Sequence, residues 1–399
     1  MLANLEFRRC AFVSSDVQRA IISVRSCGAR RIRDTVQLHH VSFNENLFLI
    51  NSTSLGMNVP SCSAVEMIDV HIRNNSFGGV AGAVLSRDNS LQNITIERNL
   101  HIGPIEDIAA FVFYAPPDSR TRAQGIVAVE NEGGIFAIDA GILTLTESSF
   151  SQNTAGIGER QIEGLSACLH LVNSVAEIEN CEFLENQAEV GSSILAVGSN
   201  LTLDNCLFGR NSAVQGGAVD IRNSSAVFIN SCSFTGNQAS GVGAGGAVFA
   251  HNSSVTCVGA IFVNNSAVSG GSLFITSSGS LNMTSSFASL GNAELGGVIF
   301  LRGNSTGSLA DCVFDNNSAI ELGGIAHTYR AEQLVIDDCQ MTNGNSTLGG
   351  FLSAFESALT VRNSRCENGS ATNGGAIRTS NSVLNVQNVS LISNSATEH

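Results

Sequence analysis

The chain has 399 residues and a hydrophobic fraction of 43%, which supplies enough apolar material for a continuous core and excludes wholesale disorder. All 20 basic residues are Arg, and with 34 acids the net charge of −14 argues against nucleic acid or anionic lipid as a partner. No run of 18 apolar residues predicts a membrane-spanning helix. The acidity lies in residues 123–399, where 8 Arg and 23 acids give −15, while residues 1–122 are nearly neutral.

Residues 1–130 are expected to form degenerate coils of a repeating fold, with a projecting insertion near residues 101–124. The first nine residues lack the apolar core of a signal peptide. The insertion holds Pro104, Pro116 and Pro117 and an aromatic run at residues 111–114. It is expected either to pack over the flank or, since long insertions on rigid scaffolds often carry binding, to contact a ligand.

Residues 131–399 carry two markers that recur with one period, which predicts a repeat architecture. The first is a glycine pair followed by apolar residues, as at Gly216-Gly217, Gly245-Gly246 and Gly374-Gly375, and the last seven copies are 29, 25, 26, 27, 26 and 25 residues apart. The second is a Phe followed three residues later by Asn. Its regular copies are Phe150/Asn153, Phe183/Asn186, Phe208/Asn211, Phe234/Asn237, Phe262/Asn265 and Phe314/Asn317.

Each repeat unit contains three short apolar segments separated by turns rich in Asn, Ser and Gly, and none shows a sustained helical period. We predict an all-β, right-handed, single-stranded parallel β-helix of about 14 coils of roughly 25 residues. The Phe positions should stack inside the coil, and the Asn should bond the equivalent Asn of the next coil at a corner. The glycine pair should permit a tight turn. The chain is expected to be one continuous solenoid and a fragment of a longer protein.

The pairing of Gly-Gly-Ala-Ile at residues 374–377 with the Phe-x-x-Asn marker resembles the repeats of the polymorphic outer-membrane proteins of chlamydiae. The resemblance covers residues 131–399 well and residues 1–130 loosely. It implies a surface-exposed or secreted, adhesin-like passenger of the pectin-lyase-like superfold. The chain shows neither a C-terminal membrane barrel nor a signal, so the autotransporter mechanism is not carried over.

Five cysteines lie two residues before the Phe position or its equivalent and are expected to form one line along the solenoid. They are Cys181, Cys206, Cys232, Cys312 and Cys339. Vertical neighbours would lie about 4.8 Å apart, which permits disulfides without requiring them. The alternative is a ladder of reduced thiols packed as small apolar side chains. Zinc is disfavoured because no paired Cys-x-x-Cys spacing occurs.

Candidate catalytic residues are sparse, and no catalytic, cofactor or metal site is assigned. Polysaccharide cleavage needs clustered carboxylates or calcium beside a basic residue. The adjacent pair Asp337-Asp338, together with Asp311, offers either a calcium site or a solvated turn. His327, near Tyr329 and Arg330, has no acidic pair beside it in the sequence. The His39-His40 pair is expected to be structural or at the surface.

The predicted function is a non-catalytic, extracellular or cell-surface protein, adhesive or structural, that presents a long binding surface. Its expected partners are glycans or cell-surface proteins, and it is expected to be a monomeric rod or part of a larger protein. The alternative is a polysaccharide lyase or glycoside hydrolase of the same superfold. Thirteen Asn-x-Ser/Thr sequons mildly favour a eukaryotic secretory route.

Overall fold

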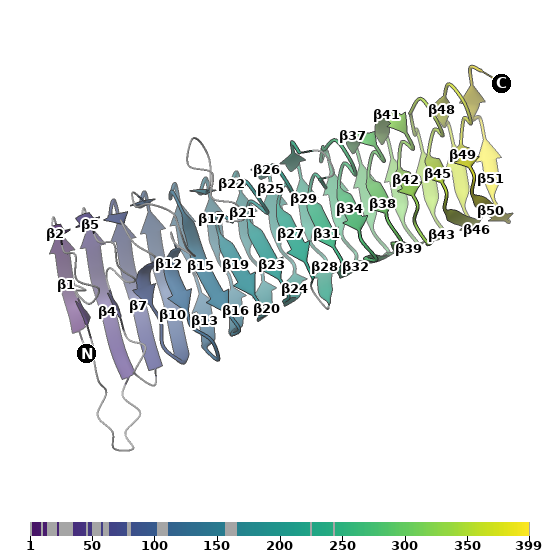
Figure 1. Ribbon diagram of the computed structural model, residues 1–399. Helices are drawn as coiled ribbons and strands as arrows, with labels where there is room; N and C mark the ends of the chain where they lie inside the picture. Colours follow the sequence, from purple (N-terminus) through teal and green to yellow (C-terminus); the bar gives the residue numbers. More distant parts are fainter. Residues whose placement is uncertain are drawn as a thin grey trace. The chain divides into compact units, whose positions relative to one another are not determined.

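A computed structural model of the chain describes residues 2–8, 11–13, 22–23, 35–44, 47–49, 57–58, 64–77, 81–101, 111–155, 166–223, 226–241 and 244–398. The chain divides into two compact units, unit 1 (Met1–Leu195) and unit 2 (Ala196–His399). Within each unit the described elements are all β-strands, stacked coil upon coil (Figure 1). Each unit is therefore a parallel β-solenoid, as the repeat predicted.

The coils of unit 1 contain a first, a second, a short corner and a third strand, and in the earliest coils the first two are fused into one long strand. The fused strands are β1 (Leu2–Arg8), β4 (Thr35–Asn44), β7 (Ala64–Arg73) and β10 (Asp88–Glu97). The separate first and second strands are β13 (Arg120–Gln124) and β14 (Val127–Val129), β16 (Ile142–Thr146) and β17 (Ser149–Ser151), and β20 (Val175–Glu179) and β21 (Glu182–Leu184). The corner strands are β2 (Ala11–Val13), β5 (Leu47–Leu49), β8 (Ser76–Phe77), β11 (Leu100–His101), β18 (Thr154–Ala155) and β22 (Gln187–Ala188). The third strands are β3 (Ile22–Ser23), β6 (Met57–Asn58), β9 (Ala81–Val84), β12 (Phe111–Ala115), β15 (Gly134–Asp139) and β19 (Leu169–Val172).

Unit 2 repeats the same order with more regular lengths, after β23 (Ile194–Val197), which contains the boundary residue. Its first strands are β24 (Asn200–Asp204), β28 (Val227–Asn230), β32 (Ser254–Val258), β35 (Ser280–Thr284), β39 (Thr306–Ala310), β43 (Gln333–Asp337), β46 (Ala358–Arg362) and β50 (Val383–Gln387). Its second strands are β25 (Leu207–Gly209), β29 (Ser233–Thr235), β33 (Ile261–Val263), β36 (Phe287–Ser289), β40 (Val313–Asp315), β44 (Gln340–Thr342), β47 (Arg365–Glu367) and β51 (Ser390–Ile392). Its corner strands are β26 (Ser212–Ala213), β30 (Gln238–Ala239), β37 (Asn292–Leu295), β41 (Ser318–Leu322), β48 (Ser370–Ala371) and β52 (Ser395–Ala396). Its third strands are β27 (Val219–Arg222), β31 (Val248–His251), β34 (Leu273–Thr276), β38 (Ile299–Arg302), β42 (Ala326–Tyr329), β45 (Leu352–Phe355) and β49 (Ile377–Ser380).

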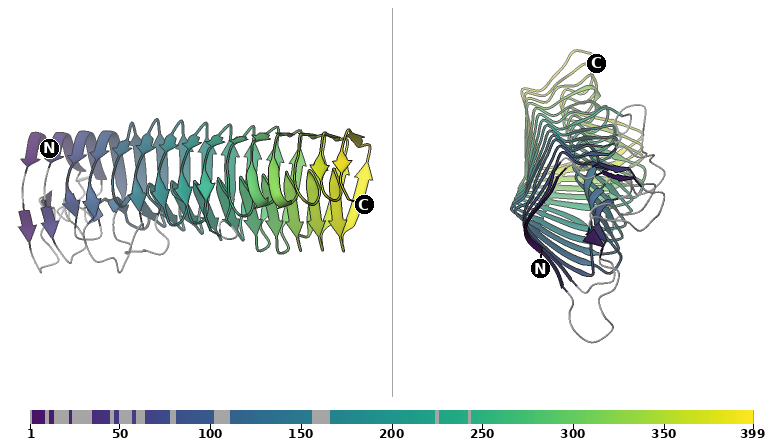
Figure 2. Two further views of the ribbon diagram at one scale, coloured as in Figure 1. Left: turned by 90° about the horizontal axis from the view of Figure 1, so that it is seen from above. Right: turned by 90° about the vertical axis from the view of Figure 1, so that its left-hand side faces the viewer.

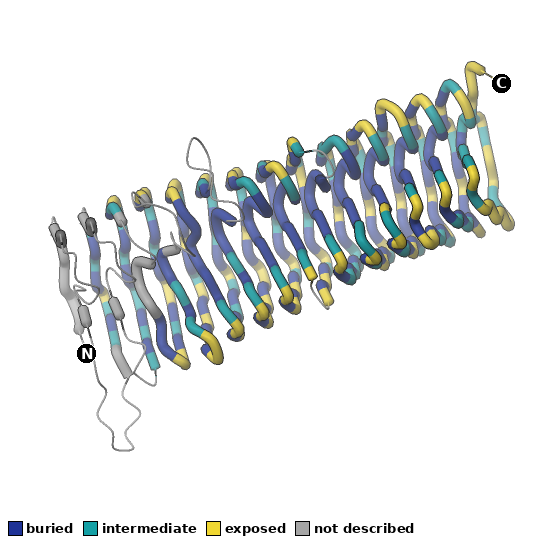
Figure 3. Tube along the Cα trace, viewed as in Figure 1, coloured by how far each residue is buried: buried dark blue, intermediate teal, exposed yellow. Residues whose placement is uncertain are grey.

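Each strand pairs in parallel with its equivalent one repeat later, so identical positions lie over one another (Figure 2). In unit 2, Phe208, Phe234 and Phe262 are in register, and their rings stack at 4.7 and 5.1 Å between centroids. In unit 1, Phe150 and Phe183 stack at 5.0 Å. All five rings are fully buried. Along first strands such as β24 and β35 buried positions alternate with more exposed ones, whereas third strands such as β27 and β34 are buried at three consecutive positions (Figure 3). Strand alternation thus sends one set of side chains into the coil.

The corner asparagines of neighbouring coils form hydrogen-bonded ladders. In unit 2, Asn211 Nδ2 donates to Asn237 Oδ1 at 3.0 Å, and Asn237 Nδ2 donates to Asn265 Oδ1 at 3.0 Å. The same bond joins Asn153 to Asn186 in unit 1. Where Gly291 replaces Asn, its backbone N–H donates to Asn317 Oδ1 at 2.9 Å. The ladder thus satisfies polar groups that no water reaches.

The glycine pairs allow close approach between coils. Gly216 has φ +57° and Gly374 φ +69°, a left-handed conformation that glycine adopts without steric cost. A Cβ on Gly217 would lie 1.9 Å from the carbonyl oxygen of Gly246, which leaves no room for any side chain. The pair therefore combines a turn with a backbone contact.

The prediction of a projecting insertion near residues 101–124 is wrong for residues 111–124. These residues form β12 and β13, which pair in register with β15 and β16, respectively. The aromatic run alternates as a third strand, with Phe113 fully buried and stacked 5.2 Å from Phe136. Pro116 and Pro117 occupy the turn between the two strands, where a missing N–H costs nothing. Residues 102–110 lie outside the described part of the chain.

A second aromatic ladder, absent from the sequence-based prediction, lies on the third strands of unit 2. Phe249, Phe274 and Phe300 follow one another in register, with centroids 5.6 and 5.0 Å apart. Their side chains point away from the coil interior, because they alternate with inward-pointing residues of their strands. Leu295 packs the corner strand β37 against the side chains of this ladder.

Candidate functional site

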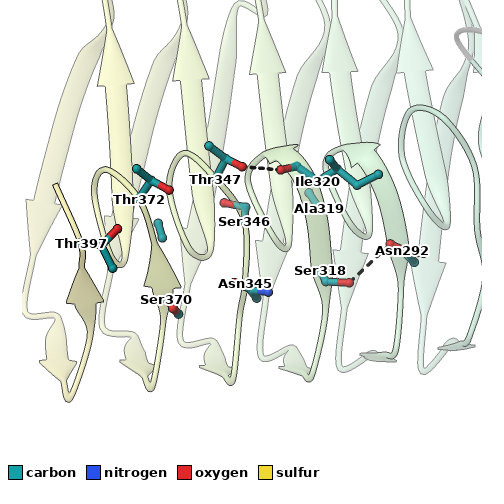
Figure 4. Close-up of a pocket in the computed structure, with 11 residues that line it drawn as sticks. Asn292, Ser318, Ala319, Ile320, Asn345, Ser346, Thr347, Ser370, Thr372 and Thr397 are labelled. Carbon is teal, nitrogen blue, oxygen red and sulfur yellow. Dashed lines mark hydrogen bonds between the residues drawn. The ribbon is translucent and has the colours of Figure 1, made fainter.

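The candidate functional site of unit 2 is a groove of about 440 Å³ along its corner segments (Figure 4). Its lining comes from equivalent positions of successive coils, and all of it is uncharged. The lining residues are Asn292, Ser318, Ala319, Ile320, Asn345, Ser346, Thr347, Ser370, Ala371, Thr372 and Thr397. We call this surface the corner groove.

One row of the corner groove consists of amides and hydroxyls in register. Asn292 pairs with Ser318, Ser318 with Asn345, and Asn345 with Ser370 through parallel bridges. Ser318 Oγ donates to Asn292 Oδ1 at 3.4 Å. Since coils are about 4.8 Å apart, the row presents one polar side chain at each such step.

A second row runs beside the first, two residues later in each coil. Ile320 is followed by Thr347, Thr372 and Thr397 in successive coils. Thr347 Oγ1 donates to the Ile320 carbonyl at 2.6 Å, and the Thr372 backbone N–H donates to the Thr347 carbonyl at 2.9 Å. The Thr372 and Thr397 hydroxyls bond no other described side chain, and each offers one donor and two acceptor lone pairs.

Between the rows lie small side chains that form the floor of the groove. Ala319 and Ala371 are buried there at 5% and 6% exposure, and Ser346 Oγ is occupied by a 2.8 Å bond to the Gly349 carbonyl. Ile320, at 65% exposure, adds an apolar wall. The corner groove thus offers hydroxyls, amides and methyl groups but no charge.

Two carboxylates lie beside the groove without lining it. Glu294 and Glu321 are exposed residues of β37 and β41, and the residues that follow them, Leu295 and Leu322, are in register. The pairing of the two strands shifts register between Ala293 and Leu295, so Glu294 has no direct register partner in β41. Glu398, which follows Thr397, is likewise close in sequence to the groove lining.

The predicted repeat residues lie away from the corner groove, inside the solenoid or at its turns. Phe314 and Asn317 are fully buried, like their equivalents in the preceding coils. Asn317 Nδ2 donates to the Ala288 carbonyl at 3.0 Å, so its amide binds the neighbouring coil rather than a ligand. A Cβ atom added to Gly245, Gly246 or Gly375 would likewise lie 2.3 Å or less from a backbone atom of another residue.

The predicted cysteine line is composed of buried free thiols. Each thiol donates to the carbonyl two residues earlier, as Cys232 does to Asn230 at 3.2 Å and Cys339 to Asp337 at 3.2 Å. The Cys206 backbone N–H in turn donates to Cys232 Sγ at 3.4 Å. Ser286, at the same position of another coil, makes the same bond to Thr284 at 2.8 Å. Cys and Ser are therefore interchangeable turn-closing groups here, and Cys181 and Cys312 follow the same pattern.

The buried thiols differ in acidity. Burial raises the pKa of Cys257 and of Cys366, which lie outside the cysteine line, to about 12. Within the line, the pKa of Cys232 is raised, first by its hydrogen bond with Cys206 and then by burial, whereas the hydrogen bond with Cys339 lowers the pKa of Cys312. Because the thiolate is the reactive species, a raised pKa makes Cys232, Cys257 and Cys366 less reactive in the folded protein.

The acids proposed for calcium are engaged in pairs along the turns. Asp337 accepts from Arg362 at 3.0 Å and from Asn363 at 2.9 Å, and these contacts, led by the Asn363 hydrogen bond, lower the pKa of Asp337. Asp311 accepts from Ser285 Oγ at 2.9 Å, and Asp338 occupies a turn with φ +51°. Among the described residues no group of three or more His, Cys, Asp or Glu is placed to hold a metal ion.

The histidine cluster named from sequence does not form one site, although His327 and Tyr329 lie on the same side of β42. His327 is buried and stacked 5.1 Å from Phe300, with Nδ1 3.1 Å from the Ser353 carbonyl. Burial lowers its pKa to about 4, so the ring is neutral near pH 7. Tyr329 instead stacks on Phe355 at 5.4 Å beneath the Arg330 guanidinium. In unit 1, His40 Nδ1 lies 3.2 Å from Asp69, and His39 lies 3.6 Å from Glu66.

One buried ion pair was missed from the sequence. Asp220 is fully buried, and both its carboxylate oxygens accept from Arg222, at 2.8 and 3.1 Å. Arg222 also donates to Gln215 at 2.9 Å. Burial raises the pKa of Asp220 to about 6 despite the opposing effect of Arg222. The sequence holds one indication of this buried pair. Asp220 lies between the apolar residues Val219 and Ile221, at a position that Phe occupies in the next two coils.

Comparison with known proteins supports the fold and its handedness. Residues 133–293 match a family model described as a right handed beta helix region. A 200-residue part of the chain is 27% identical to metabotropic glutamate receptor-like protein R of Dictyostelium discoideum, covering 50% of this chain and 12% of the relative's length. Among the described residues, no helix is long and apolar enough to span a membrane. The described strands form the all-β parallel solenoid that the repeats predicted, and the match over residues 133–293 is consistent with a right-handed β-helix.

Proposed function

We propose that this protein is a non-catalytic, adhesin-like protein of the cell surface or extracellular space, and that its corner groove binds a neutral glycan chain. The observation that carries the proposal is the uncharged lining of amides and hydroxyls, repeated once per coil along the groove. Such groups form hydrogen bonds with sugar hydroxyls as donors and as acceptors. A periodic row also matches a ligand that is itself a repeating chain.

The composition of the groove favours a neutral ligand over a charged one. Its lining holds no Arg to pair with a uronic acid or sulfate and no acid to pair with a cation. The acidic character of the chain, −14 overall, further disfavours anionic polymers by repulsion. Ile320 and the alanine floor supply apolar contact for the carbon-bound faces of sugar rings.

The proposed location rests on two resemblances. The Phe-x-x-Asn and Gly-Gly-Ala-Ile repeats resemble those of polymorphic outer-membrane proteins, which implies a surface-exposed passenger. The Dictyostelium relative carries a receptor-like name, although the chain spans only 12% of its length. Both favour a place where glycans of cells or matrices are within reach.

The test is a panel of neutral polysaccharides and glycans presented to protein made in bacteria, where eukaryotic N-glycans are absent. We expect retention of a neutral glycan that is weakened about thirtyfold by the double variant Thr372→Val and Thr397→Val, since each of the two lost hydrogen bonds contributes about 1 kcal/mol. Thr202→Val, which removes an exposed hydroxyl of β24, is the matched control and should bind like the wild type. Equal retention by all three proteins would exclude the corner groove as the binding site.

Polysaccharide cleavage is the second candidate, and Glu294 and Glu321 are the observation that favours it. Glycosidases use two carboxylates on either side of the scissile bond, about 5 to 9.5 Å apart. The two glutamates belong to the paired corner strands β37 and β41 beside the groove. New reducing ends in the same panel, abolished by Glu294→Gln with Glu321→Gln, would establish this activity and overturn the non-catalytic proposal.

A further inference from the structure

The described asparagines differ in burial, and the sequons fall among the exposed ones. Twelve of the thirteen sequon asparagines lie in the described residues, and every one is exposed: Asn74, Asn93, Asn200, Asn223, Asn252, Asn264, Asn282, Asn304, Asn316, Asn345, Asn368 and Asn388. Ten asparagines of the described residues are buried: Asn75, Asn89, Asn99, Asn131, Asn153, Asn186, Asn211, Asn237, Asn265 and Asn317. None of these begins a sequon. The folded solenoid therefore leaves each described acceptor amide accessible.

Three of these sequons form a row on a single line of turns in unit 2. Asn264, Asn316 and Asn368 each follow a second strand and have φ of 53°, 52° and 59°. They are 52 residues apart, which is two coils, while the intervening coils place Leu290 and Asn343 on the same line. Since coils are about 4.8 Å apart, acceptors in the row are about 10 Å apart. That spacing leaves more lateral room than at Asn223 and Asn252, in adjacent coils, whose amides lie 3.2 Å apart.

We propose that Asn264, Asn316 and Asn368 carry N-linked oligosaccharides, which form a row beside the corner groove. The inference rests on the extracellular location in the proposed function. The Nδ2 atom of each amide forms a bond to the anomeric carbon of an oligosaccharide carried on a lipid diphosphate. The bond from that carbon to the diphosphate breaks, the amide releases one proton, and the lipid diphosphate leaves with the electron pair.

The folded contacts of the row are compatible with this modification. Asn316 Nδ2 donates to Asp315 Oδ2 at 2.8 Å, and Asn368 Nδ2 donates to Asn343 Oδ1 at 3.3 Å. A primary amide has two N–H donors, so the modified nitrogen keeps one for this bond. Ser318 and Ser370, the third residues of two of these sequons, line the corner groove, so the glycans would stand along its edge.

The experiment expresses the full 399-residue chain, fused to a secretion leader, in a eukaryotic cell line. Secreted protein is treated with peptide N-glycosidase in heavy-oxygen water, which converts each occupied Asn to a labelled Asp, and its peptides are mapped by mass spectrometry. We expect label at Asn264, Asn316 and Asn368, and one lost glycan for each of Asn264→Gln, Asn316→Gln and Asn368→Gln. Ser370→Ala should abolish the glycan at Asn368, and Ser370→Thr should retain it.

The matched control is Asn343→Gln, an exposed asparagine on the same line of turns, which does not begin a sequon. It should leave every glycan in place. If the secreted, folded protein carries no label at the three positions, the proposed row of N-linked glycans is wrong. The proposal that the corner groove binds a glycan would be unaffected, because it is tested with protein made in bacteria. Label at Asn345, inside the groove, would instead overturn the groove as a ligand site and leave the row intact.

Discussion

Asn316 and Asn317 are consecutive in the chain, yet the solenoid uses them in opposite ways. Asn317 is fully buried in the corner ladder, where it accepts from Gly291 and donates to Ala288. Asn316 is exposed at a left-handed turn, and its amide bonds only the neighbouring Asp315. The same side chain therefore serves as an internal cross-link at one position and as a turn former and modification site at the next. Residue type is dictated by packing in the first case and by backbone conformation in the second.

The largest expected loss in the free energy of unfolding comes from breaking the corner ladder of asparagines at Asn265. Asn265→Ala removes the acceptor for the backbone N–H and the amide of Asn237, and the donor to the Phe234 carbonyl. Each buried group left unpaired costs about 1 to 3 kcal/mol, so we expect a loss of about 3 kcal/mol or more in the free energy of unfolding. Urea unfolding measures it. The neighbour Asn264→Ala should lose only about 1 to 2 kcal/mol, from the left-handed turn, and equal losses would contradict the comparison.

Asp220 is a second fully buried polar residue, and unlike the buried asparagines it can carry a charge. Its pKa is raised to about 6 by burial, so the native state holds its proton more tightly than the unfolded state. Its stabilising contribution is therefore full below about pH 4 and is lost as the pH rises through about 6, by about 3 kcal/mol in all. We expect the stability difference between Asp220→Asn and the wild type to shift by this amount in favour of the variant between pH 4 and pH 7. A difference independent of pH would show that Asp220 is not a buried titrating group.

A smaller effect is expected on the cysteine line, where Cys and Ser make the same turn-closing bond. Cys339→Ser keeps a donor to the Asp337 carbonyl and should change stability by less than about 1 kcal/mol. Cys339→Ala leaves that carbonyl without the bond and should cost about 1 kcal/mol more than the serine variant. Thermal unfolding of the two variants compares them. A serine variant as unstable as the alanine variant would mean that the thiol acts by packing alone.

The smallest effect is expected at the exposed turns. Asn316→Gly keeps a residue that adopts positive φ readily and removes only a solvent-exposed hydrogen bond to Asp315. We expect a change in the free energy of unfolding within about 0.5 kcal/mol. Denaturant unfolding of protein made in bacteria, which excludes any glycan, is the measurement. A loss comparable to that of Asn265→Ala would show that the turn line also carries the fold.

The sequence predicts those parts of the fold in which one residue type recurs at one position. Phe234 and Asn237 reveal the inward stack and the corner ladder because each position admits few alternatives. The strand at Phe111–Ala115 was misread as a loop because its prolines lie at its end, in the turn, and not within it. The outer ladder of Phe249, Phe274 and Phe300 was missed although each Phe follows a glycine pair by four residues or fewer.

The corner groove was beyond prediction from the sequence for a physical reason. Its lining residues, such as Ser318 and Thr347, belong to segments that read as ordinary Ser- and Asn-rich turns. They form one surface only because the coils stack in register and the corner strands fold back over Phe300. Register depends on contacts between residues about 26 positions apart, which no local pattern specifies.

The measurement that tests the central claim most directly is calorimetric titration of bacterial protein with neutral oligosaccharides of increasing chain length. A groove that repeats one row of polar groups per coil should bind longer chains more tightly until the lined coils are filled, and then no further. The double variant Thr372→Val and Thr397→Val should flatten this dependence. Affinity that is absent at every length, or that ignores chain length and survives the double variant, would contradict the assignment of the corner groove as a glycan-binding site.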